Sequence, residues 1–364
     1  MAVREDETLF DRVRGAMLGG AVGDALGWPI EFLQLAQIRE RHGVSGVTGF
    51  LPGLLPDAPQ QITDDTQMTL FTAEGLLRCP PGADPAPVLR RAYLRWLSTQ
   101  EQAKPAPEPD GWLAGRQFLY AMRSPGHACT SGLRLQAKEY RAPHLPGERG
   151  PVNPNSKGCG TVMRSAPFGL AALGPHKAFD AAMRCAQLTH GHPTGYLAAG
   201  AFAALIDSVL SGVELPIAVR DIIIRLTSIP ADSSETVSAL AGALAFAHLG
   251  PPTPERVEQV GQGWVAEECL AIAVYCALYA FRTGDVRGAL LLSVNHSGDS
   301  DSTGAVAGNL IGAVHGLSAL PPEWVSAVEG RDELVQIADD LVLNFFYRDR
   351  SRLETRYPLD TSVS

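Results

Sequence analysis

Residues 15–27 read GAMLGGAVGDALG, with a glycine at every fourth position, and residues 304–314 (GAVAGNLIGAV) repeat this spacing. The recurring glycines are Gly15, Gly19, Gly23, Gly27, Gly304, Gly308 and Gly312. A glycine in a helix interior costs about 1 kcal/mol relative to alanine, so both segments need a compensating interaction. Close contact between two helix backbones is the simplest such interaction. We therefore expect both segments to be helices that pack tightly.

Helical periodicity also dominates outside these two segments. Apolar residues recur at helical spacing within residues 199–210, 237–244 and 334–345. The alternation with a period of two that is typical of strands is almost absent. The only strand-like run is residues 221–226 (DIIIRL), which fits a buried helix equally well. We therefore predict an all-α fold of roughly ten or more helices.

The composition indicates a protein with a large core and no nucleic-acid partner. Of the 364 residues 45% are hydrophobic, and the formal net charge is −9. No run of Lys and Arg is interleaved with aromatic residues, so neither nucleic acid nor an anionic membrane is expected to bind. The six cysteines are scattered without a CxxC pair. This spacing indicates reduced cytosolic thiols rather than disulfides or a zinc site.

The N-terminal sequence predicts no secretory signal. Residues 1–7 read MAVREDE, which is acidic and lacks an apolar core region. The longest apolar stretches, such as residues 270–281, are too short and too interrupted to span a bilayer. We therefore expect a cytoplasmic protein without a membrane segment, and we expect it to be a monomer.

No low-complexity linker and no internal repeat divides the chain. We expect a single domain over residues 1–364, with a core from about residue 10 to about residue 348 and short tails. Two stretches, residues 104–110 and 141–160, are rich in Pro and Gly. Long irregular segments in a compact helical protein often carry function, although an ordinary surface excursion also explains the first of them.

Acidic residues gather at the ends of three expected helices. Residues 62–66 (ITDDT) precede an amphipathic run, residues 298–304 (GDSDSTG) precede the second glycine segment, and Glu31 follows the first, which contains Asp24. Helix capping explains any one such cluster, because Asp, Ser and Thr are preferred N-cap residues and carboxylates suit a helix N-terminus. Capping needs one side chain, however, and not four carboxylates.

The paired carboxylates indicate a metal site. Asp64 lies beside Asp65 and Asp299 lies two residues from Asp301, so each pair would repel without a cation. Carboxylate and hydroxyl oxygens are hard ligands, which favours Mg²⁺ or Mn²⁺ over zinc or copper. Four or five carboxylates are more than one Mg²⁺ usually recruits, so we predict a two-metal site.

Two other metal motifs fit less well. Residues 299–304 (DSDSTG) resemble the start of an EF-hand loop, but the twelfth position is Leu310 rather than Glu, and the intervening residues read as helix. Residues 189–192 (THGH) have no cysteine or third histidine nearby. A zinc site is therefore not expected there.

Together the motifs resemble the ADP-ribosylglycohydrolases, a family that includes dinitrogenase-reductase-activating glycohydrolases and the ADP-ribosyl-arginine and ADP-ribosyl-serine hydrolases. The resemblance covers nearly the whole chain, with five motifs in the family's order. They are residues 14–32 (RGAMLGGAVGDALG to Glu31-Phe32), 63–66 (TDDT), 156–164 (SKGCGTVMR), 263–268 (GWVAEE) and 298–304. The resemblance implies an all-α, orthogonally packed helix bundle and an enzyme that removes ADP-ribose from modified proteins.

The resemblance also implies a ligand set for two Mg²⁺ or Mn²⁺ ions. The implied ligands are Thr63, Asp64, Asp65, Asp299, Asp301 and Ser302. Asp301 is the best candidate for a bridging carboxylate, and Thr303 is an alternative to Ser302 that the sequence leaves open. Glu31 matches the family's mobile glutamate, which contacts a metal, gates the site or acts as base. We take Glu31, Asp64 and Asp299 as candidate catalytic residues.

Residues 155–164 resemble the family's loop around the pyrophosphate. Glycines permit close approach of the backbone, whose N–H groups then bind phosphate oxygens. The loop is not a Walker A motif, because Thr161 rather than Lys follows Gly160. The candidate substrate-binding residues are Ser156, Gly158, Cys159, Gly160, Thr161 and His190. Cys159 is interpreted as a small loop residue rather than a nucleophile, and His192 as structural.

The resemblance implies hydrolysis at ribose C1 through an oxocarbenium-like transition state. The metals would hold the ribose hydroxyls and present a water of lowered pKa, and Glu31 or an aspartate would complete its deprotonation. We predict an ADP-ribosyl-arginine protein as substrate and ADP-ribose as product, because residues 299–304 resemble the arginine-specific branch. The open alternatives are an O-linked (serine), small-molecule or nucleic-acid conjugate of ADP-ribose, and a catalytically silent ADP-ribose-binding scaffold.

Two features leave a choice open. Many family members have Gly-Gly-Asp before the last acidic cluster, whereas this chain has Ser297 in place of the first glycine. The serine would alter the local turn or place a hydroxyl near the ribose, without changing the ligand set. Glu267 and Glu268 open a helix and are equally well explained as capping or as functional residues.

Overall fold

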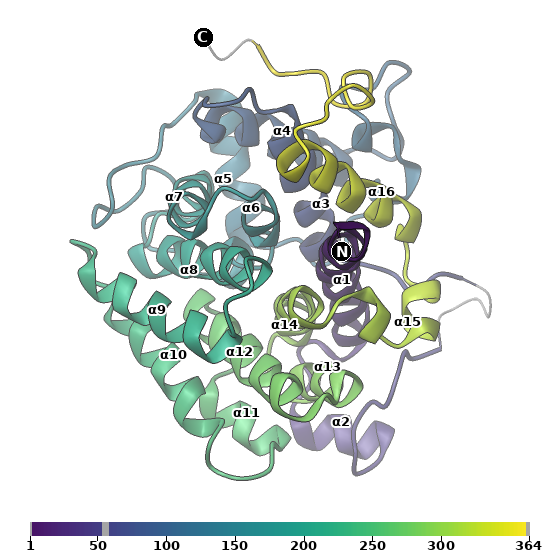
Figure 1. Cartoon of the computed structure of the whole chain (residues 1–364), viewed down its shortest axis with the longest axis vertical. Coiled ribbons are helices and arrows are strands. Elements are labelled where there is room, and N and C mark those ends of the chain that lie inside the picture. The colour runs from purple at the N-terminus through teal and green to yellow at the C-terminus, as the bar shows by residue number, and fades with distance from the viewer. Residues whose placement is uncertain (1, 53–57, 362–364) are drawn as a thin grey trace.

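The computed structural model describes residues 2–52 and 58–361, with side chains from residue 7 onward. These residues form sixteen α-helices and no strand, which confirms the all-α prediction (Figure 1). The helices are α1 (Ala2–Gly27), α2 (Leu35–His42), α3 (Asp64–Arg78), α4 (Pro85–Glu101), α5 (His127–Lys138), α6 (Ala166–Leu170), α7 (Pro175–Ala186), α8 (Pro193–Leu210), α9 (Leu215–Ser228), α10 (Ser234–Phe246), α11 (Pro254–Val260), α12 (Ala266–Thr283), α13 (Val286–Val294), α14 (Ser300–His315), α15 (Pro322–Ala327) and α16 (Arg331–Leu341). Short helical turns are η1 (Trp28–Ile30), η2 (Leu113–Gly115), η3 (Gln117–Leu119), η4 (Cys159–Thr161), η5 (Leu317–Ala319) and η6 (Val342–Phe346).

The helices cross one another at steep angles. In Figure 1 α1 and α14 are seen nearly end-on in the middle of the molecule, whereas α16 and α10 lie across the view. This arrangement agrees with the orthogonal bundle that the family resemblance implies. α1 and α14 form the most extensive helix pair of the fold.

α1 and α14 pack along their glycine stripes, as expected from the sequence. A Cβ placed on Gly23 would lie only 1.9 Å from the backbone oxygen of Gly304, so no side chain fits between the helices. The facing pairs are Gly15 with Gly312, Gly19 with Gly308, Gly23 with Gly304 and Gly27 with Ser300. Residue numbers rise along α1 as they fall along α14, so the two helices are antiparallel. The C-terminal end of α1 therefore lies beside the N-terminus of α14.

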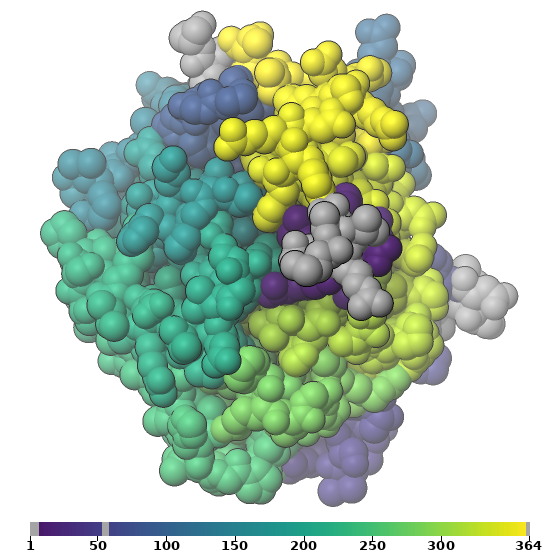
Figure 2. All heavy atoms as spheres, viewed as in Figure 1, coloured from purple at the N-terminus to yellow at the C-terminus, as the bar shows by residue number. Residues whose placement is uncertain are grey.

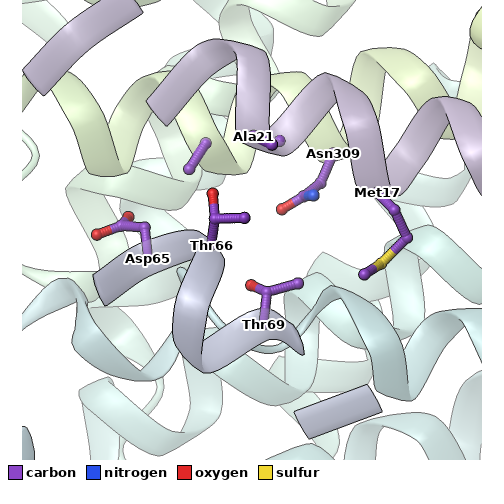
Figure 3. A pocket seen from close by; sticks show the side chains of 8 residues that line it. Met17, Ala21, Asp65, Thr66, Thr69 and Asn309 are labelled. Atoms are coloured by element: carbon purple, nitrogen blue, oxygen red, sulfur yellow. The ribbon is translucent and has the colours of Figure 1, made fainter. Parts of the chain in front are cut away.

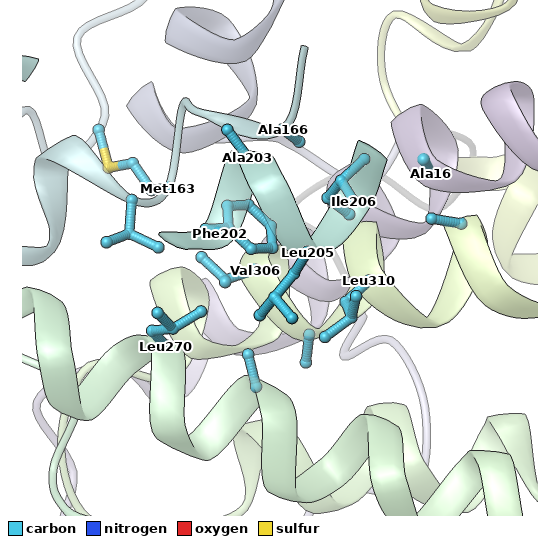
Figure 4. Packing of buried hydrophobic residues seen from close by; sticks show 14 of the residues in the cluster. Ala16, Met163, Ala166, Phe202, Ala203, Leu205, Ile206, Leu270, Val306 and Leu310 are labelled. Carbon is cyan, nitrogen blue, oxygen red and sulfur yellow. The ribbon is translucent and has the colours of Figure 1, made fainter. Parts of the chain in front are cut away.

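α8 runs through the hydrophobic core. Its residues Phe202, Ala203 and Ile206 lie among side chains of α1, α12 and α14 (Figure 4). By length and composition α8 is the one described helix that could cross a membrane, but 89% of its 18-residue apolar window is buried inside the protein. Its apolar surface is therefore used for packing against neighbouring helices.

The strand-like run at residues 221–226 lies within α9. Ile222 on this helix is buried, whereas Ile224 is 65% exposed. The run is thus one turn and a half of an amphipathic helix at the edge of the bundle. Its three consecutive isoleucines mask that amphipathic pattern in the sequence.

Of the two Pro/Gly-rich stretches, residues 104–110 have a structural role. Asp110 forms ion pairs with Arg78 (3.2 Å) and Arg95 (3.3 Å). Arg78 is the last residue of α3, so the stretch lies about 20 Å along that helix from its N-terminus. It is the ordinary surface excursion that the sequence left as an alternative.

The packed structure extends beyond the expected core boundary at residue 348. Tyr357 is fully buried and donates its hydroxyl to Asp340 Oδ2 (2.9 Å), and Arg350 donates to the backbone oxygen of Leu77 (2.9 Å). In Figure 2 this C-terminal segment (yellow) covers the surface next to the N-terminal end of α1 (purple). The segment after residue 348 is therefore part of the core rather than a short tail.

Candidate active site

Three helix ends meet at one place in the fold. The C-terminal end of α1 lies beside the N-terminus of α14, and Asp24 joins α1 to the N-terminus of α3. The Asp24 carboxylate accepts the backbone N–H of Thr63 (3.0 Å) and of Thr66 (3.2 Å) and the hydroxyl of Thr66 (2.5 Å). Asp24 thus has a structural role, because it holds two helices in a fixed relation.

This junction gathers six carboxyl groups, here called the acidic cluster. They belong to Asp24, Glu31, Asp64, Asp65, Asp299 and Asp301. The N-termini of α3 and α14 both favour negative charge through their helix dipoles. The structure therefore brings together all the acidic residues that the sequence singled out as ligands or catalytic groups.

The N-terminus of α14 presents two aspartates. Asp299 caps the helix by accepting the backbone N–H of Ser302 (3.3 Å), and its Oδ2 accepts the thiol of Cys159 (2.9 Å). Asp301 accepts the same Ser302 N–H (2.9 Å). Capping therefore uses only part of the hydrogen-bonding capacity of these two carboxylates.

The structure distinguishes the two hydroxyls that follow. The Thr303 hydroxyl lies within hydrogen-bond distance of the backbone oxygens of Asp299 (2.7 Å) and Ser293 (2.8 Å) and of His296 Nε2 (2.8 Å). The Ser302 hydroxyl contacts only the sulfur of Met163, at 4.0 Å. Ser302 therefore has the hydroxyl that is free to bind a cation.

The N-terminus of α3 contributes the second pair of aspartates. Thr63 is the N-cap and accepts the backbone N–H of Asp65 (3.3 Å). Asp64 accepts the backbone N–H of Gly126 (3.1 Å). Asp65 Oδ1 is buried and has no hydrogen-bond partner among the described residues. An unpaired buried carboxylate oxygen is costly, and a bound cation would supply the missing partner.

A narrow crevice lies behind Asp65, between α1, α3 and α14 (Figure 3). Its lining residues are Met17, Gly20, Ala21, Asp65, Thr66, Thr69, Ala305 and Asn309. Asn309 donates its side-chain N–H to the backbone oxygen of Ala16 (2.8 Å). A Cβ on Gly20 would lie 2.0 Å from that side-chain nitrogen, so the glycine makes room for Asn309. The Asn309 hydrogen bond thus joins α14 to α1 beside this crevice, next to the acidic cluster.

Glu31 lies just beyond the end of α1, after the turn η1. Its Oε2 accepts the hydroxyl of Ser124 (3.0 Å), and the Ser124 oxygen accepts the indole N–H of Trp28 (3.1 Å). One carboxylate oxygen each from Glu31, Asp299 and Asp301 lies within 4.8 Å of the others. That spacing suits the oxygen ligands of a small divalent cation.

Burial is the largest cause that raises the pKa of each carboxyl group in the acidic cluster, and the charge of Asp301 raises the pKa of the other five further. The pKa of Asp24 is raised to about 7 and that of Glu31 to about 8. Like charges buried together disfavour ionisation unless a cation compensates them. The chemistry of this donor set therefore fits hard divalent metal ions.

The glycine loop borders the acidic cluster through Cys159. The Cys159 backbone N–H donates to the oxygen of Trp264 (3.1 Å). Gly160 and Thr161 follow it in the short turn η4, and the N–H groups at the start of a helical turn lack most of their partners within the turn. Burial, with the charge of Asp299, raises the pKa of the Cys159 thiol well above its usual range. A protonated thiol that donates to a carboxylate is not a nucleophile, in agreement with the sequence interpretation.

The other predicted loop residues differ in what they offer. The Thr161 hydroxyl donates to the backbone oxygen of Gly195 (2.7 Å). Thr161 therefore offers a ligand its backbone N–H rather than its hydroxyl. Gly158 and Gly160 face the ring of His190, and a Cβ would lie 3.4 Å from it on Gly158 and 3.1 Å from it on Gly160. Ser156 is half-buried, and its backbone oxygen accepts the N–H of His192 (3.2 Å). These residues shape the loop rather than the acidic cluster.

His190 is buried behind the glycine loop. Its Nδ1 lies 2.8 Å from the Thr189 hydroxyl. Burial, and then the charge of Arg164, lowers the pKa of His190 to about 3, so the ring is neutral at ordinary pH. His192 instead caps α8 by accepting the backbone N–H of Thr194 (3.3 Å), which matches the structural role expected for it.

Glu267 and Glu268 support the loops around the site. Glu267 forms an ion pair with Lys157 (2.5 Å). Glu268 accepts the backbone N–H of Gln262 (2.9 Å) and of Gly263 (3.3 Å). Both glutamates therefore act on loop structure, and neither is among the groups of the acidic cluster.

Ser297 does not place a hydroxyl in the site. Its oxygen accepts the backbone N–H of Leu35 (2.8 Å), and its hydroxyl donates to Glu258. These contacts tie the first turn of α2 to the loop before α14. Of the two possibilities for this serine, the structure agrees with an effect on the local turn.

One residue near the site, Ser124, was not found from the sequence. It lies in an irregular segment, and only the neighbouring Pro and Gly indicate a turn there. Arg164, the last residue of the loop motif, was given no particular role from the sequence. It is fully buried, with its guanidinium 4.6 Å from the ring of Tyr93 and 2.6 Å from the Thr189 hydroxyl. Charged residues are seldom buried without a partner, and only the structure shows this burial.

Comparisons with known proteins agree over nearly the whole chain. The family model described as ADP-ribosylglycohydrolase matches residues 5–350. The ADP-ribosyl-[dinitrogen reductase] glycohydrolase of Rhodospirillum rubrum is 27% identical over 328 residues, which cover 90% of this chain and 93% of the relative. The ADP-ribosylarginine hydrolase Tri1 of Pseudomonas putida (strain GB-1) is 26% identical over 340 residues, covering 92% of this chain and 79% of the relative.

Two further similarities extend this range. The ADP-ribosylhydrolase ARH3 of Danio rerio is 25% identical over 370 residues, covering 93% of this chain and 90% of the relative. A solved structure described as an ADP-ribosylglycohydrolase-related protein complex has 26% sequence identity and a TM-score of 0.62. That similarity covers 92% of this chain and 98% of the solved chain.

Proposed function

This chain belongs to the ADP-ribosylglycohydrolase family, and we propose that it uses two divalent cations, Mg²⁺ or Mn²⁺, to release ADP-ribose from modified arginine side chains of proteins. The family supports hydrolysis of ADP-ribosyl groups in general. The observation that carries the finer proposal is the acidic cluster, which lies beside the glycine loop at the start of η4. We take the whole chain as one catalytic domain that acts as a cytoplasmic monomer, and all six cysteines are free thiols.

The proposed metal ligands come from the N-termini of two helices. They are Thr63, Asp64 and Asp65 of α3 and Asp299, Asp301 and Ser302 of α14. Asp301 is the proposed bridging ligand, because its charge acts on the other five carboxyl groups of the cluster. When bound, the two ions hold ribose hydroxyls, lower the pKa of a water and stabilise developing charge. Asp64 and Asp299 then keep this arrangement in place.

The chain's own residues bind the substrate and move the proton. The backbone N–H groups of Gly160 and Thr161 would bind the pyrophosphate, with neutral His190 behind the loop. Glu31 would take the proton of the attacking water, because its carboxylate lies within 4.8 Å of oxygens of Asp299 and Asp301 and is held by the Ser124 hydroxyl. Water adds at ribose C1, the bond from C1 to the guanidine nitrogen breaks, and that nitrogen receives a proton.

The arginine linkage is the finest part of the proposal. The sequence at residues 299–304 resembles the arginine-specific branch, and one relative is an ADP-ribosylarginine hydrolase. The free Ser302 hydroxyl beside Asp301 supports the view that the motif is intact in three dimensions as well. The relatives also include ADP-ribosylhydrolase ARH3, so the linkage needs a direct test.

The test measures release of ADP-ribose from an ADP-ribosyl-arginine protein with Mg²⁺, with Mn²⁺ and with chelator. We expect release with either metal and none with chelator. The matched variant is Asp301→Asn, which is expected to lower turnover by about two orders of magnitude or more while the protein still folds. Full activity of this variant would contradict the proposed metal site.

Two other outcomes would redirect the proposal. Release from a serine-linked or small-molecule conjugate, with none from the arginine conjugate, would keep the metal mechanism and change the substrate. Metal-dependent ADP-ribose binding without release from any conjugate would indicate a silent binding scaffold on the same fold.

A further inference from the structure

Two aromatic rings stack at the edge of the acidic cluster. The rings of Phe32 and Trp264 lie 5.2 Å apart, centroid to centroid, with an interplanar angle of 22°. Phe32 directly follows Glu31, and Trp264 accepts the backbone N–H of Cys159, whose thiol binds Asp299. The pair therefore connects the two sides of the proposed active site.

Both rings are held in place by their own backbone. Phe32 has a φ of +66°. This left-handed backbone conformation is unfavourable for a residue with a bulky side chain. Gly263 also has a positive φ, +87°, and Glu268 binds its N–H and that of Gln262. Gln262 in turn accepts the N–H of Asp299 (2.9 Å). Trp264 is thus anchored to the segment that carries the proposed metal ligand Asp299. Its stacking against Phe32 offsets the backbone strain at Phe32.

The pair is exposed and carries no cation. Phe32 is 67% exposed and Trp264 is 36% exposed. Elsewhere an exposed ring of this protein, that of Tyr140 (37% exposed), lies under one of its own arginines, Arg90 (5.6 Å). Among the side chains that the structure describes, residues 7–52 and 58–361, no arginine or lysine lies over the ring of Phe32 or Trp264. This exposed aromatic surface lies beside the proposed active site, and no described cation of the protein covers it. A cationic group of a substrate can therefore stack on it.

We propose that the Phe32–Trp264 pair is the platform for the guanidinium group of the modified arginine and so determines specificity for the acceptor side of the bond; this rests on the proposed function. A guanidinium is planar and cationic, and it stacks on aromatic faces. As carboxylates, the six groups of the acidic cluster carry more negative charge than two divalent ions neutralise. The local electric field therefore also favours a cation. A neutral serine side chain gains from neither effect.

The position of Phe32 favours the acceptor over the adenine as occupant. The bond that breaks lies at ribose C1, next to Glu31 and the metal ligands. The adenine is separated from that bond by a ribose, two phosphates and a second ribose. Phe32 directly follows Glu31 in the chain, so the pair is tied to the residue proposed to act at ribose C1 rather than to a group several bonds away.

The experiment compares Phe32→Leu and Trp264→Leu with the wild-type protein in Mg²⁺. Leucine keeps the apolar bulk and, at position 32, the same backbone strain, but it removes the aromatic face. We expect kcat/KM for ADP-ribosyl-arginine to fall about tenfold, mainly through KM, because the contact is present before and during the reaction. The Kd for free ADP-ribose, measured by calorimetry, is expected to change less than about twofold.

Two matched variants serve as controls. Trp264→Phe keeps an aromatic ring and is expected to retain most of the wild-type kcat/KM. Tyr347→Leu disrupts a second stacked pair, with Phe10 at 6.1 Å, at the other end of α1 and is expected to change nothing. Phe10 lies about 27 Å along the helix direction from Trp28, which follows α1.

The outcomes separate the two proposals. Unchanged kcat/KM in both leucine variants, or an equal loss of ADP-ribose affinity, would overturn the platform while leaving the arginine-specific function intact. A wild-type protein that binds ADP-ribose but releases none from the arginine conjugate would overturn the proposed function, and with it the occupant of the platform.

Discussion

Glu31 depends on a hydrogen-bond chain that involves residues far from it in sequence. The indole of Trp28 donates to Ser124, and Ser124 donates to the Glu31 carboxylate. Ser124 has a φ of +48°, so the backbone of its turn is strained in a way that aims the hydroxyl at Glu31. Hydrogen bonds to charged groups contribute roughly 1.5–3 kcal/mol. Ser124 is therefore a positioning residue for the proposed base.

The variant Ser124→Gly removes this hydroxyl without adding backbone strain, because glycine adopts a positive φ readily. We expect kcat to fall about tenfold, since one charge-assisted hydrogen bond is lost, and the Kd for ADP-ribose to stay within about twofold. Steady-state kinetics and calorimetry in Mg²⁺ measure the two effects. Ser318→Gly, which removes an exposed hydroxyl that binds Asp11, is the control. An unchanged kcat in Ser124→Gly would show that Glu31 needs no such support.

At the scale of elements, the α1–α14 pair sets the position of every group in the acidic cluster. Contact between the helix backbones fixes both their separation and their register. A shift of one residue would separate Glu31 from Asp299 and Asp301. Asp24 then couples α3 to the pair through three donors, namely two backbone N–H groups and one hydroxyl. The glycines that look costly in each isolated helix are therefore required by the site.

We predict that Gly23→Ala destabilises the protein strongly. Its Cβ would lie 1.9 Å from the Gly304 oxygen, which forces the helices apart, and overpacking of this kind costs about 3 kcal/mol or more. Gly242→Ala in α10 is the matched control, because its Cβ meets no atom within 4 Å. That change is expected to raise the free energy of unfolding by about 0.5–1 kcal/mol. Urea unfolding of both variants measures the difference, and equal stabilities would refute the role of the stripe.

At the scale of the whole molecule, one core supports a site assembled from distant parts of the chain. α8 fills the centre of that core, and it carries one acidic residue, Asp207, near its C-terminal end. Asp207 is buried and accepts the backbone N–H of Gly174 (3.1 Å), while its Oδ1 has no partner. Burial raises the pKa of Asp207 to about 6. This carboxyl group thus makes global stability depend on pH at a point remote from the site.

The sign of the effect follows from proton binding. At about pH 3, below the ordinary pKa of 3.8, the Asp207 carboxyl group is nearly neutral in the folded and the unfolded chain. As the pH rises towards 6 the unfolded chain loses this proton first, so stability is lost until the folded pKa of about 6 is passed. The variant Asp207→Asn lacks this loss. It is expected to match the wild type at about pH 3 and to be more stable by about 3 kcal/mol at pH 8.

Urea unfolding at a series of pH values in chelator measures this difference. The gap between Asp207→Asn and the wild type should grow between about pH 3 and pH 6 and stay constant above that range. A gap that is the same at every pH would mean that the Asp207 carboxyl group does not titrate differently in the two states.

The sequence by itself determined the helical class, the tight pairing of the two glycine segments and the identity of the acidic groups. These features are local: periodicity, glycine spacing and adjacent carboxylates are each visible within a few residues. The run at residues 221–226 remained ambiguous because a short apolar segment fits a buried strand or helix equally well, and only its packing in α9 decided the matter. The end of the core was placed too early, because the burial of Tyr357 depends on partners in α16.

Only the tertiary structure decided which groups meet. The choice between Ser302 and Thr303 rests on His296 and Ser293, which occupy the threonine hydroxyl. The direction of Ser297 and the support of Glu31 by Ser124 likewise depend on contacts between segments that are far apart in the chain. Hydrogen-bond partners are set by distance and angle in three dimensions, and neither quantity is encoded in the spacing of residues along a sequence.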